Sequence, residues 1–155
     1  MRLREKEITD RYEIEELLTK VNVCRMGLCD GSMPYVVPTT FGYRNGVIYL
    51  HSSKHGRKID VLRENNRVCI AVDTGHELVQ GPLDTSCKST IRFKSVIATG
   101  RAKFVEDEAE KKKAMDVIMA QAFGDQKFEY APEGLRDMAI IKIELETITG
   151  KKSGY

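Results

Sequence analysis

The chain has 155 residues, 41% hydrophobic and 31% charged, a composition typical of one globular domain covering residues 1–155. Its 25 basic and 23 acidic residues leave a net charge of only +2, so nucleic acid is not an expected partner. No apolar run is long enough to span a membrane and no signal peptide is recognisable, which predicts a cytoplasmic protein without a membrane partner. The four cysteines form no CxxC pair or cluster with histidine, so no metal site is expected.

The first part of the chain predicts a helix followed by two strands. Asp10 and Glu13 form a capping-box pattern, and the apolar residues that follow recur at helical spacing. The strands are predicted over residues 23–29 and 34–41, joined by a turn. Because Pro38 has no N–H to donate, the second strand must lie at a sheet edge or face a ligand.

The most informative stretch is 47–63, in which a strand is followed by a polar loop and a helix. Asn45-Gly46 favours the tight turn of a hairpin, and β-branched and aromatic residues then predict a strand over 47–50. The next residues, 51–58, carry hydroxyls, imidazoles and cations. Apolar residues at helical spacing resume at Ile59.

Three cations stand where this helix should begin, namely Lys54, Arg57 and Lys58. The helix dipole normally favours acidic residues at this position, and each exposed cation costs about 0.3–1 kcal/mol. The cost disappears when an anion binds among the hydroxyls, the backbone amides and the cations. The stretch therefore predicts a phosphate site, and the alternative is a solvated basic turn in which Ser53 caps the helix.

The segment Y-L-H-S-S-K-H-G-R-K-I-D-V-L-R-E-N-N-R-V, residues 49–68, resembles the FMN-phosphate segment of the pyridoxamine-phosphate-oxidase-like flavoproteins. Its His51-Ser52 pair and its longer loop before Gly56 are most similar to the branch called nitroimidazole-resistance proteins. The resemblance extends from residue 4 to about residue 151. It implies a mainly β fold, an FMN-binding six-stranded antiparallel split β-barrel, which forms a homodimer with two flavins at the interface.

The rest of the chain adds three strands, one helix and two long segments without regular periodicity. These are strands over 67–73, 90–105 and 139–148, a loop over 74–89, a helix between Asp107 and Gly124, and a polar loop over 126–137. Short strands with few helices indicate an antiparallel barrel or sandwich, and the resemblance narrows this to the split barrel.

The resemblance also implies where a flavin binds. One strand would line the isoalloxazine ring through Val37, Pro38, Thr39 and Thr40. The phosphate would be bound by Ser52, Ser53, Lys54, Arg57 and Lys58. A neighbouring subunit would contribute Arg92, Phe93 and Ser95.

His51 is the candidate catalytic residue, because an imidazole at the strand end can hydrogen-bond the cofactor or protonate a reduced substrate. The alternative is an orienting role without proton transfer. Oxidases of pyridoxamine phosphate begin and end the ring-lining strand with Arg and Lys, whereas this chain has Tyr35 and Thr40 there and no tryptophan. Oxidation of vitamin B6 is therefore not expected.

The function that the resemblance implies is a small FMN-dependent reductase, which passes electrons to a nitroaromatic or similar small acceptor, with a nicotinamide nucleotide as candidate donor. Three alternatives remain at this point. The protein could be a flavin-binding or redox-sensing module without dedicated catalysis, a haem- or deazaflavin-binding relative, or an anion-binding protein without flavin.

Overall fold

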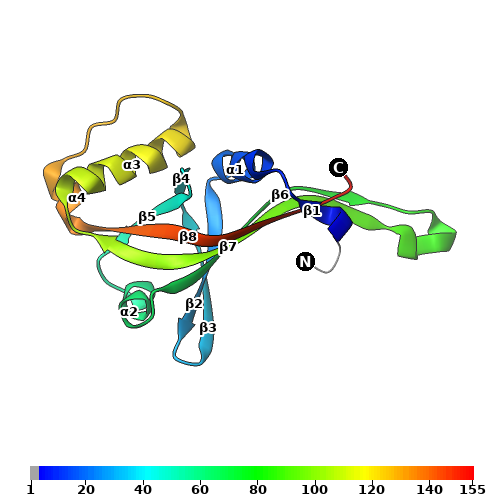
Figure 1. Ribbon diagram of the computed structural model, residues 1–155, viewed down its shortest axis with the longest axis horizontal. Coiled ribbons are helices and arrows are strands. Elements are labelled where there is room, and N and C mark those ends of the chain that lie inside the picture. Colours follow the sequence, from blue (N-terminus) through cyan, green and yellow to red (C-terminus); the bar gives the residue numbers. More distant parts are fainter. Residues whose placement is uncertain (1–3) are drawn as a thin grey trace.

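Eight antiparallel strands form one sheet in the computed structural model, which describes residues 4–155 (Figure 1). Their order is β3-β2-β6-β7-β8-β5-β4, and β1 pairs with β8. The strands are β1 (Glu7–Ile8), β2 (Val23–Asp30), β3 (Met33–Thr40), β4 (Gly42–Arg44), β5 (Val47–Ser53), β6 (Arg67–Val79), β7 (Thr90–Val105) and β8 (Met138–Ser153). The helices are η1 (Arg4–Lys6), α1 (Arg11–Lys20), α2 (Arg57–Glu64), η2 (Leu83–Lys88), α3 (Glu108–Phe123) and α4 (Pro132–Asp137).

The sheet curls until β3, at one edge, contacts β5 near the other edge. β4 covers only Val47 to Tyr49 of β5, so the end of β5 has a bare edge on that side within residues 4–155. No ladder joins β3 to β5 in this part of the chain, and the barrel is split there. The predicted split barrel and the predicted edge position of Pro38 are thus confirmed, with short β1 and β4 added to the six predicted strands.

Side chains that alternate inward along the strands fill the barrel. Met26, Ile48, Ile70 and Ile143 are at most 1% exposed. Burying each contributes about 1.5–3 kcal/mol. A second core lies beneath α3 and α4, where Met115, Ile118, Leu135 and Ile140 are buried together.

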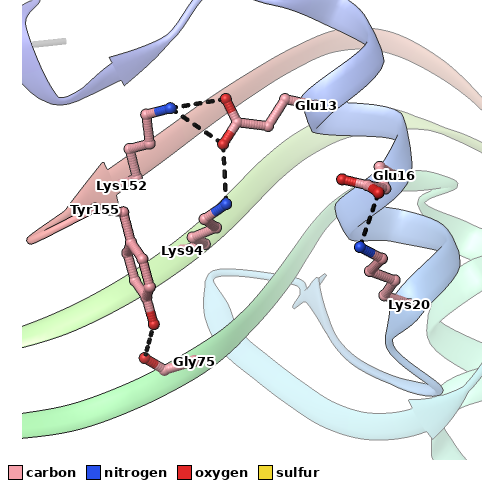
Figure 2. A network of polar contacts seen from close by, with 7 residues as sticks. All are labelled: Glu13, Glu16, Lys20, Gly75, Lys94, Lys152 and Tyr155. Atoms are coloured by element: carbon pink, nitrogen blue, oxygen red, sulfur yellow. Dashed lines mark hydrogen bonds and ion pairs between the residues drawn. The ribbon is translucent and has the colours of Figure 1, made fainter.

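α1 begins as predicted, because the Asp10 carboxylate accepts the Tyr12 N–H at 2.9 Å. Glu13 does not close a capping box. Its carboxylate instead accepts hydrogen bonds from Lys94 Nζ at 3.0 Å and from Lys152 Nζ at 2.8 Å (Figure 2). These two ammonium groups hold the pKa of Glu13 below its ordinary value and join α1 to β7 and β8.

The predicted loop over 74–89 is wrong in its first part. β6 continues to Val79 by pairing with β7, past an irregularity in register between Thr74 and Glu77. Gly75 has a φ of +67°, which glycine adopts easily, and its carbonyl accepts the Tyr155 hydroxyl at 2.7 Å (Figure 2). Together with η2 the two strands form a long arm that extends from the barrel (Figure 1).

The predicted loop over 126–137 is also wrong at its end. Residues Pro132–Asp137 form α4, in which Pro132 stands in the first turn and Leu135 is buried against the second core. β8 extends beyond the predicted 139–148 because its last residues pair with β7 as far as Ser153. Within residues 4–155, no helix combines the length and the apolar character of a membrane span.

Candidate functional site

The predicted phosphate residues lie where β5 ends and α2 begins, beside the split in the barrel. The N-cap of α2 is Gly56, with a φ of +117° that other residues rarely adopt, and no side chain caps the helix in residues 4–155. Ser53 is therefore not the cap, and its hydroxyl accepts the His55 N–H at 3.3 Å instead. The first turn of α2 carries uncapped amide donors, the cations Arg57 and Lys58 and one carboxylate, Asp60, so cations outnumber the acid where an anion could bind.

Arg57 joins the start of α2 to the β2–β3 hairpin. Its Nε donates to Asp30 Oδ2 at 2.8 Å, and its guanidinium carbon lies 4.4 Å from the centroid of the Tyr35 ring. These two contacts orient the guanidinium at the split, although its side chain is 55% exposed. The Nε–Asp30 bond partly balances its charge and leaves the two terminal amino groups for a ligand.

Lys58 is the half-buried cation of the site. Burial lowers its pKa, and the one charge interaction that opposes this effect in the described residues comes from Cys24. Cys24 is a buried thiol on β2, and burial raises its pKa to about 12, so it supplies no negative charge at neutral pH. A partly desolvated ammonium without a carboxylate is unfavourable, and an anion bound at the split would stabilise it.

The ring-lining strand β3 presents its predicted residues on two faces. Val37 and Thr39 are half-buried on the barrel side, while Pro38 and Thr40 are exposed on the outer side. Thr39 lies opposite Cys24 in the β2–β3 ladder, so the inward face of β3 is next to the strand that Lys58 approaches.

The predicted residues of β5 also separate. Ser52 is half-buried on the same face as buried Leu50, whereas His51 is exposed on the other face and lies opposite Ile140 of β8. Lys54 lines a cavity away from Arg57 and Lys58. The structure therefore places Ser52 on the barrel face of β5 and Arg57 and Lys58 at the start of α2, whereas His51 and Ser53 share the other face of β5 and Lys54 lines a different cavity.

Arg92, Phe93 and Ser95 lie near the start of β7, where this strand pairs with the second half of β6 and with the end of β8. Val105, at the other end of β7, and His51, near the end of β5, both pair with Ile140 of β8. Val105 is ten residues from Ser95. At 3.3 Å per residue this separation is about 33 Å. These residues are therefore distant from the end of β5 along their own chain.

Sequence reasoning missed three residues that shape the site: Asp30, Tyr35 and Cys24. Asp30 and Tyr35 contact Arg57, and Cys24 is near enough to Lys58 to affect its charge; each pair is more than twenty residues apart, so helical or strand periodicity carries no signal of it. Their presence on two strands joined by a hairpin was the one available indication that they share a surface.

Residues 10–152 match the sequence profile of the pyridoxamine 5'-phosphate oxidase family. The chain belongs to this family. Among solved structures, it is 37% identical to a proposed 5-nitroimidazole antibiotic resistance protein from Bacteroides thetaiotaomicron, with a TM-score of 0.84 over 94% of this chain and 86% of the other. The predicted family and branch are thereby confirmed.

Two further relatives lie at greater distance. A FAD-binding protein from Mesorhizobium loti is 26% identical, with a TM-score of 0.67 over 94% of this chain and 96% of the other. An uncharacterized protein from Rhizobium meliloti is 27% identical over 94 residues. That match covers 61% of this family member and 54% of the curated relative, so it extends over about half the length of that protein.

Proposed function

We propose that this member of the pyridoxamine 5'-phosphate oxidase family binds FMN at the split between β3 and β5 and acts as a flavin-dependent reductase. The observation that carries the proposal is the half-buried Lys58, which lacks a carboxylate partner in the described residues and stands beside the uncapped start of α2. Family membership and the FAD-binding neighbour from Mesorhizobium loti support a flavin. The cation at the start of a helix favours a flavin that carries a terminal phosphate.

The residues present fit such a phosphate. Lys58 and the first amides of α2 would donate to its oxygens, and Arg57 would add its two free amino groups. Ser52 and Ser53 supply hydroxyl donors from the end of β5. When bound, FMN would supply the electron transfer, while the chain holds and orients it.

The face of β3 would set the position of the ring. Thr39 offers a hydroxyl, which in the protein alone donates to the Thr40 carbonyl at 3.3 Å, and Val37 offers apolar surface. Pro38 has no backbone N–H, so β3 presents one hydrogen-bond donor fewer at this position. His51 is exposed and faces away from Ser52, so an orienting or proton-donating role for it requires a flavin or substrate that reaches round the end of β5.

We expect the site to include a second copy of the chain, because Arg92, Phe93 and Ser95 are distant from the split along their own strand and would take part from a partner subunit. The outer face of the sheet carries exposed apolar residues. Ile97, two residues from Ser95 on β7, is 51% exposed, and Val36 on β3 is 60% exposed. Exposed apolar residues on one sheet face favour burial against a protein surface. We expect a homodimer in which this face is covered.

Light scattering after size exclusion tests the dimer. Ile97→Glu places a charge in the covered face and should yield monomers with weakened flavin binding. Phe123→Glu is the matched control, because Phe123 is 65% exposed on α3, outside that face. A monomeric native protein, or an Ile97→Glu variant that stays dimeric, contradicts the arrangement.

The acceptor class follows from the similarity to the Bacteroides thetaiotaomicron protein. We infer a nitroaromatic such as a 5-nitroimidazole, with a reduced nicotinamide nucleotide as the electron donor. The test is anaerobic consumption of both compounds by the FMN-loaded protein. FMN binding without turnover of any such pair would leave a flavin-binding or redox-sensing module.

The absorption spectrum of the purified protein, with mass identification of the released cofactor, tests the cofactor class. Flavin bands and the mass of FMN are expected. A strong Soret band would identify a haem-binding relative and a deazaflavin mass a deazaflavin-binding one. A colourless protein that ignores FMN would remove the reductase proposal and leave an anion-binding protein.

A further inference from the structure

A second group of cations surrounds a cavity at the end of the barrel where β7 finishes and β8 begins. The cavity has a volume of about 210 Å³. Its lining residues are Lys54, Arg63, Phe104, Val105, Glu106, Lys111, Met138, Ala139 and Ile140. Neither Arg57 nor Lys58 is among them, so the cavity is distinct from the start of α2.

Lys111, on α3, is the buried cation of this cavity, with 6% of its surface exposed. Its ammonium donates to the carbonyls of Leu135 and Met138 at 3.4 and 3.3 Å, near the end of α4, and it forms no ion pair in the described residues. Both bonds are long for an N–H donor. Lysine is rarely this buried unless it is paired, so the two carbonyls leave its charge incompletely balanced.

The other charges at the cavity do not supply the missing balance. Arg63 lies with its guanidinium carbon 5.9 Å from the centroid of Phe104, and its nearest carboxylate, on Asp60, is 3.8 Å away. Lys54 adds a third cation, and Glu106 is the one carboxylate among the lining residues in the described part of the chain. Three cations and one carboxylate give the lining a net charge of +2.

We propose that this cavity binds a small oxyanion, a carboxylate or a phosphate, between Lys111 and Arg63. The volume corresponds to about seven water molecules at roughly 30 Å³ each, which fits an anion of a few heavy atoms and excludes a flavin. Buried Lys111 would supply the fixed charge, and exposed Lys54 and Arg63 would close over the anion. Phe104, which is only partly buried, offers apolar surface that suits the carbon atoms of a carboxylate.

Isothermal titration of the protein with inorganic phosphate, acetate and succinate tests the proposal. Using the Arg57→Ala/Lys58→Ala variant removes the cations of the proposed FMN site, so that phosphate reports on the cavity alone. Saturable binding that Lys111→Met weakens by about tenfold or more is expected. Lys112→Met is the matched control, because Lys112 is exposed on the same helix and outside the lining, and it should leave the affinity unchanged.

Two further variants keep the test decisive if Lys111→Met fails to fold. Arg63→Gln changes an exposed side chain and should also weaken the oxyanion, whereas Glu106→Gln should tighten it by removing a like charge. Tighter phosphate than acetate identifies a phosphate ligand, and the reverse order a carboxylate. No saturable binding of any of the three anions up to about 50 mM, or binding that neither Lys111→Met nor Arg63→Gln weakens, overturns the proposal and leaves Lys111 as a helix cap.

Because these titrations involve no flavin, their failure would leave the FMN proposal untouched. In the same way, a protein that ignores FMN could still bind the oxyanion at Lys111. The two proposals therefore stand or fall on separate measurements.

Discussion

Lys58→Met should weaken FMN binding more than any other single change at the start of α2. The substitution keeps the length and apolar stem of the side chain and removes only the ammonium. Lys58 is half-buried, so its bond to a phosphate would be poorly screened by water, and such a charged hydrogen bond contributes about 1.5–3 kcal/mol. At 1.4 kcal/mol per factor of ten, the dissociation constant should rise about 10- to 150-fold.

Arg57→Gln should cost less, about 1 kcal/mol or roughly fivefold in affinity, because the Arg57 side chain is 55% exposed and already paired with Asp30. Quenching of FMN fluorescence during titration of the flavin-free protein measures the affinities of the native protein, Lys58→Met and Arg57→Gln. Lys112→Met is the control for loss of a lysine elsewhere. Equal affinities for native protein and Lys58→Met would refute the assignment of the phosphate to the start of α2.

For the stability of the flavin-free protein, we expect Lys58→Met to have a favourable effect. Burial lowers the pKa of Lys58, so its protonated form destabilises the folded flavin-free protein. Lys58→Met should therefore raise the urea midpoint of the flavin-free protein at pH 7. The gain should shrink as the pH rises through the lowered pKa towards the ordinary lysine value of 10.5, because the native lysine then loses its proton. A lower midpoint for Lys58→Met would mean that the ammonium has a partner within the protein.

Three further changes test the fold around the site. Glu13→Gln should lower the free energy of unfolding by about 1–2 kcal/mol at pH 7, because Lys94 and Lys152 lose a shared carboxylate. In urea titrations this difference should persist above pH 4.5, the ordinary glutamate value, and fade as the pH falls through the lowered pKa; a pH-independent difference contradicts the ion pairs. Gly42→Ala brings a Cβ within 2.7 Å of the α3 backbone and should cost about 1–3 kcal/mol in thermal unfolding, and an unchanged midpoint would mean that α3 does not pack there. Cys24, with a pKa raised to about 12, should resist thiol reagents at pH 8 until the protein is denatured, as peptide mapping can determine.

Local sequence patterns predicted the elements whose signals are local. Asp10 caps α1 through a bond two residues away, and the apolar spacing after Ile59 marks α2. The extension of β6 beyond Asp73 was not predicted, because its polar and glycine-containing sequence becomes a strand only through pairing with β7. α4 was missed for a similar reason, since a helix of six residues is stabilised by the burial of Leu135 rather than by its own periodicity.

The candidate site divides in the same way. The conflict between cations and a helix start is visible in the sequence, and the structure places Arg57 and Lys58 at that position. Their environments are set by residues distant in sequence: Asp30 holds Arg57, and Lys58 is half-buried near Cys24 of β2. Lys111 lies four residues before Met115, so helical spacing places it on the inward face of α3, and its depth is set by α4, near whose end its ammonium binds two carbonyls.

The most direct test of the phosphate assignment compares the affinities of the flavin-free protein for FMN and for riboflavin, which lacks the phosphate. If Lys58, Arg57 and the amides of α2 hold that group, FMN should bind at least about 100-fold more tightly, since two or more charged hydrogen bonds are lost with riboflavin. The preference should collapse in the Arg57→Ala/Lys58→Ala variant. Equal affinity for the two flavins in the native protein would contradict a phosphate site at the start of α2.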